Sequence, residues 1–180
     1  MKEANFIKDK KESKLRLRKH LERNKSNETI TLFPLSRVFN EVVYKANIRL
    51  KSNQKINYPL NIDNYILLFN EKLLEAALAK LIAIAFKSSG DTAVIDLIVN
   101  DENNTLKIKI ISQSISTNRI AQNAIIMDYF NGLQTVSNQG YSIDITELKN
   151  QIQKTGGLIT CDNYKNEKNT FTIKIPLIRE

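Results

Sequence analysis

The amino-acid sequence predicts an α+β protein, a two-layer α/β sandwich with a mixed, mostly antiparallel sheet and about three helices on one sheet face. Two patterns carry this prediction: segments with apolar residues at helical spacing, and pairs of alternating segments joined by polar turns. Hairpins make neighbouring strands antiparallel, and helices on one face leave the other face to solvent. A chain of 180 residues with 42% hydrophobic content is long enough for one such domain and a tail.

The first elements of the predicted domain are a short strand and a helix. Residues 30–35 are expected to form an edge strand, where Pro34 is tolerated because an edge need not donate every N–H. Ser36 is expected to cap a helix that runs to about Ala46. The apolar face of this helix is predicted to consist of Val38, Phe39, Val42 and Val43.

The clearest helical pattern follows two brief extended runs, Lys55–Leu60 and Asn64–Phe69. Asn70 is expected to cap a helix that runs to about Ser88 and ends before Gly90. Its buried stripe is predicted to contain Leu74, Leu78, Leu81, Ile82, Ala85 and Phe86.

The strongest β pattern is a hairpin of Thr92–Val99 and Leu106–Ile111, joined by the polar turn 100–104. In its second strand, Lys107 and Lys109 are expected on the face opposite the apolar side chains, which is typical of a half-buried strand.

The last third of the chain predicts two helices and a second hairpin. A helix is expected within 120–130, and another over 143–154, ended by the glycines at 156–157. The second hairpin is expected to pair Leu158–Asp162 with Thr170–Leu177.

The net charge of +8 is concentrated at the N-terminus, so we divide the chain into a basic helical tail, residues 1–28, and a domain, residues 29–180. The basic residues before Ser26 are Lys2, Lys8, Lys10, Lys11, Lys14, Arg16, Arg18, Lys19, Arg23 and Lys25. A tail of this kind can bind nucleic acid or an anionic membrane; the simpler interpretation is a solvated leader.

Several classes of protein are excluded by composition. A single cysteine, Cys161, allows no disulfide within the chain and no cysteine cluster for a metal, and we expect it to be a small core residue. A single histidine, His20, excludes most histidine-based sites. The longest apolar run, 73–86, is interrupted by Lys80 and is too short to span a membrane, and the N-terminus does not resemble a signal peptide. The sequence therefore predicts a cytoplasmic protein.

The chain contains four segments, residues 31–43, 73–89, 155–159 and 169–177, that resemble in order and spacing the motifs of the ATP-binding domain of bacterial sensor histidine kinases. Residues 31–43 resemble the start of that domain, and residues 73–89 resemble its N-box helix, L-x-x-x-L-x-N-L-L-x-N-A-I-K-Y-S. Residues 155–159 resemble the H-G-G-x-I element, and residues 169–177 resemble the last strand, G-T-x-F-x-I-x-L-P. The resemblance implies the histidine-kinase ATPase (Bergerat) fold and a role in two-component signalling.

The N-box helix departs from the family at the residue that matters most for chemistry. The family's asparagine binds Mg²⁺, a hard cation that needs an oxygen ligand, and the matching residue here is Ile84. One turn earlier, where the family often has a polar or acidic residue, this chain has Lys80. Lys87 does match the family's basic residue, which can contact phosphate.

The adenine motif D-x-G-x-G and the phosphate lid G-x-G-x-G are also altered. The residues at their positions are Ser112, Ser114, Ser116, Gly140, Ser142 and Asp144. Ser112 is shorter than the aspartate that accepts the adenine amino group, and it carries no charge. Asp144 adds a negative charge beside the expected phosphates, which repels them unless a cation intervenes.

Taken together, these replacements indicate a vestigial nucleotide pocket with no catalytic residue and no bound cofactor or metal. The leading hypothesis is a non-catalytic module that binds a response-regulator receiver domain or a kinase, or forms a homodimer through its tail, the tail being a remnant of a dimerisation helix. His20 is interpreted as a surface residue rather than a phospho-acceptor, because too little chain precedes the domain for a helical hairpin.

Two other functions stay open at this stage. The chain could be a divergent but active kinase domain that binds ATP and Mg²⁺ through a rearranged pocket. It could also bind nucleic acid through the basic tail, with a salt dependence that disappears when residues 1–26 are removed.

Overall fold

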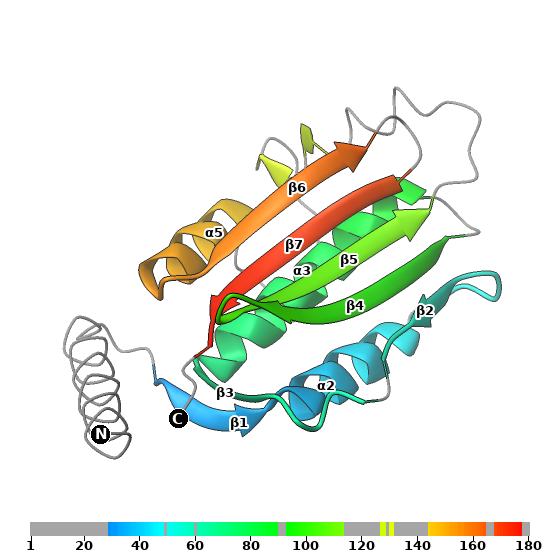
Figure 1. Ribbon diagram of the computed structural model, residues 1–180. Helices are drawn as coiled ribbons and strands as arrows, with labels where there is room; N and C mark the ends of the chain where they lie inside the picture. Colours follow the sequence, from blue (N-terminus) through cyan, green and yellow to red (C-terminus); the bar gives the residue numbers. More distant parts are fainter. Residues whose placement is uncertain are drawn as a thin grey trace, which may run out of the picture.

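A computed structural model shows one layer of helices packed on one face of a twisted sheet (Figure 1). It describes residues 29–48, 50–59, 61–89, 93–113, 127–128, 130–131, 144–164 and 168–177. The predicted tail, residues 1–28, lies outside these ranges, and so does most of the helix predicted within 120–130. The predicted α+β sandwich, with three helices over one sheet face, is confirmed.

The main sheet has five strands in the order β2-β4-β5-β7-β6. Its strands are β2 (Lys55–Asn57), β4 (Val94–Glu102), β5 (Thr105–Gln113), β6 (Leu158–Tyr164) and β7 (Lys168–Pro176). Only β2 and β4 are parallel, and every other neighbouring pair is antiparallel. The two predicted hairpins therefore form and pair with each other through β5 and β7.

A second, two-stranded sheet is formed by β1 (Thr31–Pro34) and β3 (Ile66–Phe69). The sequence predicted two short strands here but not that they pair with each other, apart from the main sheet. Phe33 and Leu67 are register partners and are both buried, so one face of this small sheet belongs to the core.

The helical layer consists of α2 (Leu35–Asn47), α3 (Glu71–Ser89) and α5 (Ile145–Lys154). The expectation that Ser36 caps the first of these is wrong, because Pro34 occupies the N-cap position with extended backbone. The proline ring fixes φ near the observed −73°, and the next N–H, of Leu35, donates to the Tyr65 carbonyl at 2.9 Å. The predicted apolar face of α2 is confirmed as buried.

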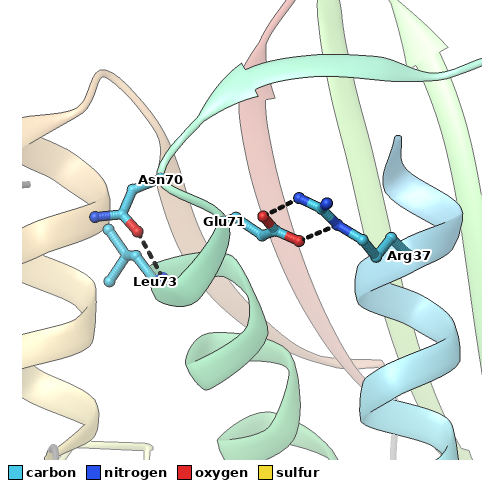
Figure 2. A network of polar contacts seen from close by, with 4 residues as sticks. All are labelled: Arg37, Asn70, Glu71 and Leu73. Carbon is cyan, nitrogen blue, oxygen red and sulfur yellow. Dashed lines mark hydrogen bonds and ion pairs between the residues drawn. The ribbon is translucent and has the colours of Figure 1, made fainter. Parts of the chain in front are cut away.

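The long central helix α3 begins as predicted. The Asn70 side-chain oxygen accepts a hydrogen bond from the Leu73 N–H at 3.0 Å, and this satisfies one of the donors at the helix start (Figure 2). The adjacent residue, Glu71, accepts two hydrogen bonds from the Arg37 guanidinium of α2 through its two carboxylate oxygens (Figure 2). This bidentate ion pair links α2 to α3. The predicted stripe of α3 is buried, except that Phe86 is partly exposed.

The turn between β4 and β5 is tighter than predicted. Asn103 and Asn104 alone form it, with φ of 50° and 59°, and the strands pair up to Glu102 and Thr105. Asparagine tolerates positive φ better than other non-glycine residues, so a two-residue turn with both central residues left-handed is possible here.

The two glycines that follow α5, Gly156 and Gly157, form the C-terminal cap of this helix. The Gly157 N–H donates to the Ile152 carbonyl at 2.9 Å and the Gly156 N–H to the Gln153 carbonyl at 3.0 Å. This is a Schellman motif, and Gly156 supplies its left-handed residue, with φ of 84°. The chain then turns directly into β6.

Within the described ranges, none of the helices has the length and apolar character required to cross a membrane.

Candidate functional site

The central helix α3 carries the three residues, Lys80, Ile84 and Lys87, that the sequence resemblance aligns with nucleotide-site positions of the N-box. Ile84 has no exposed surface, and Lys80, one turn earlier, is only 5% exposed. Lys87, at the end of the helix, is exposed to solvent. The structure therefore separates Lys87 from the buried pair, and it places an aliphatic side chain in the core where the resemblance implies a metal ligand.

Ser112, which the sequence resemblance aligns with an adenine-binding aspartate, lies near the end of β5. It is fully buried and is the register partner of Ile95 on one side and Asn169 on the other. Its hydroxyl oxygen has no hydrogen-bond partner within the described part of the chain. Because buried hydroxyls are nearly always hydrogen-bonded, this unpaired group is the most unusual polar feature of the core.

Asp144 occupies the N-cap position of α5, although its side chain makes no capping hydrogen bond. The other predicted residues of the adenine motif and the lid, Ser114, Ser116, Gly140 and Ser142, lie outside the described residues. Of the predicted site, Lys80, Ile84 and Ser112 are all buried, and they lie on α3 and β5, two elements that pack against each other.

A metal centre built by the protein alone has no candidate in the described ranges. No group of three histidine, cysteine, aspartate or glutamate side chains gathers there in a way that could hold an ion.

Phe130, which the sequence resemblance places after the adenine motif, packs in the core. The Phe130 ring lies 5.9 Å from the Phe171 ring, centroid to centroid, and Phe130 is buried. Lys149 of α5 places its ammonium 4.2 Å from the Phe130 ring centroid and 3.4 Å from the Phe130 carbonyl. This contact fastens α5 to the core by cation–π attraction and a hydrogen bond.

Cys161 lies on β6 and packs partly against the core, as expected from the sequence. Burial raises the pKa of its thiol from an ordinary 9.0 to about 12, the charge of Asp162 adds to the increase, and Lys149 opposes it. The thiolate is the reactive form, so this environment makes Cys161 a structural residue rather than a nucleophile.

We expect Cys161 to react with iodoacetamide at pH 9 at least about tenfold more slowly in the native protein than in urea. At this pH the unfolded thiol ionises while the native thiol stays protonated. Since the native pKa is the higher one, folding stability is unaffected below pH 9 and decreases as the pH rises from 9 toward 12. The Cys161→Ala variant should lack this decrease, and equal alkylation rates in both states would contradict the assignment.

Three lysines on the open face of the sheet were not identified as a site from the sequence. Lys107 and Lys109 of β5 and Lys174 of β7 lie on the face away from the helices, since the residues alternating with them are buried. Lys107 and Lys174 are register partners, and Glu102 forms an ion pair with Lys107. Strand alternation correctly predicted the face of Lys107 and Lys109, but no sequence signal pairs β5 with β7.

A shallow, solvent-open depression on the outer face of α2 was also not predicted. It is lined by Ser36, Arg37, Asn40, Glu41 and Tyr44. Tyr44 is 66% exposed, and Arg37 is held by Glu71. The arrangement of these solvated side chains does not indicate a catalytic site.

Comparison with known proteins identifies the fold. No protein-family model and no curated protein matches the sequence. Among solved structures, the nucleotide-free catalytic domain of histidine kinase ThkA superimposes with a TM-score of 0.62 at 18% identity, covering 82% of this chain and 95% of ThkA's. Histidine kinase AdeS of Acinetobacter baumannii gives a TM-score of 0.61 at 19% identity, covering 97% of this chain and 80% of that one.

A third similar structure contains a partner. ThkA in complex with the response regulator TrrA matches with a TM-score of 0.61 at 18% identity, covering 96% of this chain and 48% of that one. The chain therefore has the fold of a histidine-kinase catalytic domain, the ATPase fold that its sequence motifs resemble.

Proposed function

We propose that this protein is a non-catalytic, cytoplasmic interaction module of two-component-type signalling, built on the histidine-kinase ATPase fold. The observation that carries this proposal is the complete burial of Ile84 at the position that corresponds to the family's Mg²⁺ ligand. An aliphatic side chain offers no oxygen to a hard cation, and here it is part of the hydrophobic core.

A second residue, Ser112, supports the same proposal. A serine cannot supply the charged acceptor that an aspartate presents to an adenine amino group. Each lost charged or buried partner weakens binding by about 1–3 kcal/mol, and about 1.4 kcal/mol corresponds to a factor of ten. Loss of the metal ligand, the adenine acceptor and the lid glycines would reduce a micromolar affinity for Mg-ATP to about millimolar or weaker.

The partner we propose is a response-regulator receiver domain or a kinase. The complex of ThkA with the response regulator TrrA supports this kind of partner, because the ThkA chain has the same fold. Binding a protein partner requires the folded surface but no nucleotide, so the preserved hydrophobic framework fits this function.

One observation favours a divergent, active ATP-binding domain instead. Ser112 presents a buried hydroxyl without a partner in the described part of the chain, and such a group could serve a ligand that enters the site. A single hydroxyl provides less binding energy than the three lost groups, and for that reason we place this function second.

Isothermal titration calorimetry with Mg-ATP separates the two functions. We expect no binding stronger than about millimolar, for the energetic reason given above. A histidine-kinase catalytic domain that retains the N-box asparagine and the adenine-binding aspartate is the positive control. Micromolar binding of Mg-ATP to this protein, or transfer of labelled phosphate to a dimerisation domain supplied in trans, would contradict the proposed non-catalytic function.

A further inference from the structure

The open face of the main sheet carries a group of lysines at one end. Lys107 and Lys174 stand directly opposite each other on β5 and β7, and Lys109 follows two residues along β5 on the same face. Directly opposite residues of an antiparallel pair have Cβ atoms about 4.5–5.5 Å apart, so these three ammonium groups share one small area. In Figure 1 this face is turned toward the viewer, with the helices behind it.

The positive charge of this group is only partly neutralised. Glu102 at the end of β4 forms an ion pair with Lys107. The hydrogen bond and charge of Lys107 lower the pKa of the Glu102 carboxyl, and Lys109 and Lys174 add to the decrease. One carboxylate thus lies among three ammonium groups. We refer to Glu102, Lys107, Lys109 and Lys174 as the lysine face.

The other carboxylates of the open sheet face are placed toward the opposite end. Asp96 of β4 is the register partner of Ile111 and accepts a hydrogen bond from the Asn57 amide at 2.7 Å. Asp162 of β6 is the register partner of Thr170. Lys55 of β2 and Lys168 of β7 lie on the same face at that end, as register partners of Val94 and Gln113. The charges of that end therefore balance, whereas the end with Lys107, Lys109 and Lys174 keeps a net positive charge.

Like charges directly opposite each other on neighbouring strands destabilise a sheet. The Lys107–Lys174 pair is therefore unfavourable for folding, and the single carboxylate of Glu102 relieves it only in part. Residues that act against stability are a common sign of a binding surface. An anionic partner would remove the repulsion and gain attraction from all three lysines.

The residues between the lysines favour a protein as this partner. Ile98, opposite Lys109, is 38% exposed, and Leu158, opposite Lys174, is 43% exposed. These aliphatic side chains offer apolar area that a protein partner can bury, and charge complementarity steers such a partner to the site. Single-stranded nucleic acid is usually bound on aromatic side chains, and the described residues at this end of the sheet include none.

We propose that the lysine face docks an acidic surface of a protein partner, an inference that rests on the proposed interaction function and names the surface that performs it. The surface is separate from the altered nucleotide site, since it lies on the sheet face opposite the helices.

The test is a ¹⁵N NMR titration of the 180-residue chain with an oligoglutamate peptide in low-salt buffer. We expect the peptide to shift the amide signals of β5 and β7 around Lys109 and Lys174. Lys109→Gln and Lys174→Gln should each weaken this binding by about two- to fivefold, and Glu102→Gln should strengthen it by a similar factor. All four proteins keep residues 1–28, so differences among them originate in the sheet.

Matched controls carry the same change of charge elsewhere. Lys72→Gln removes a positive charge from an exposed position of α3. Asp101→Asn removes a negative charge from the neighbour of Glu102; strand alternation places Asp101 on the opposite face of the sheet from Glu102. Both controls should bind the peptide like the natural protein. The inference is overturned if only signals of residues 1–28 shift, or if the controls change affinity as much as the lysine-face variants.

A parallel titration with an oligothymidylate of equal charge tests the class of partner. Weaker binding of the oligonucleotide, without specific loss in the lysine-face variants, supports a protein partner. Equal binding with equal losses overturns that assignment in favour of a nucleic acid. The Mg-ATP titration and the peptide titration test different claims. Tight ATP binding would reject the proposed non-catalytic function, whereas failure of the peptide titration would reject only the lysine face as the docking surface.

Discussion

Replacing Ile84 with asparagine, the residue found in the family, is expected to destabilise the protein by about 4 kcal/mol and to restore no Mg²⁺-dependent ATP binding. Ile84 has no exposed surface and belongs to the hydrophobic core. The substitution removes apolar contacts and buries an amide that has few groups to bond with. Urea unfolding followed by circular dichroism measures the first effect, and calorimetry with Mg-ATP measures the second.

Ile84→Val is the matched control for this experiment. It keeps the apolar character of the position and should lower the free energy of unfolding by only about 1 kcal/mol. If Ile84→Asn instead unfolds at nearly the natural urea concentration and acquires Mg²⁺-dependent nucleotide binding, the position is open to ligand. The interpretation of the site as closed by an aliphatic side chain would then be wrong.

Gly157→Ala is expected to lower the free energy of unfolding by about 2–3 kcal/mol, a large effect for one methyl group. A Cβ at this position would lie 2.8 Å from the Lys174 carbonyl oxygen and 2.9 Å from Ile152 Cγ2. The carbonyl belongs to β7 and cannot rotate away, so the turn from α5 into β6 would have to shift away from the sheet. Thermal or urea unfolding of the variant measures the loss.

Gly156→Ala separates steric contact from backbone conformation. Gly156 has φ of 84°, so alanine is strained there, and we expect a loss of about 1 kcal/mol. A Gly157→Ala variant that is no less stable than Gly156→Ala would show that the contact with β7 is easily relieved, contrary to the expectation.

Much of the fold follows from local sequence patterns. The helix with the stripe of Leu74, Leu78 and Leu81 was predicted with its cap, Asn70, and the hairpin around Asn103 was predicted from alternation. Helical and strand periodicity arise from which side of one element is buried, and neighbouring residues are sufficient to show this. The errors are local as well: Pro34 overrides Ser36 as the start of α2 because its φ is fixed.

For the candidate site, the sequence predicted the identities of the residues but not their burial or hydrogen bonding. Sequence alone shows which residues align with the motifs of the histidine-kinase domains that it resembles, among them Ile84 and Ser112. It does not show that Ile84 is fully buried or that the Ser112 hydroxyl lacks a partner in the described part of the chain, since both depend on how α3 packs against β5.

The sequence by itself determined the fold class and most element types, and its resemblance to histidine-kinase domains predicts that Ile84 and Ser112 stand at metal and adenine positions. The tertiary structure decided the rest: the separate β1–β3 sheet, the closure of the core around Ile84, and the pairing that sets Lys107 of β5 opposite Lys174 of β7. The physical reason is sequence separation. Periodicity specifies the face of each strand, but which distant strands become neighbours depends on the burial of all their apolar faces together.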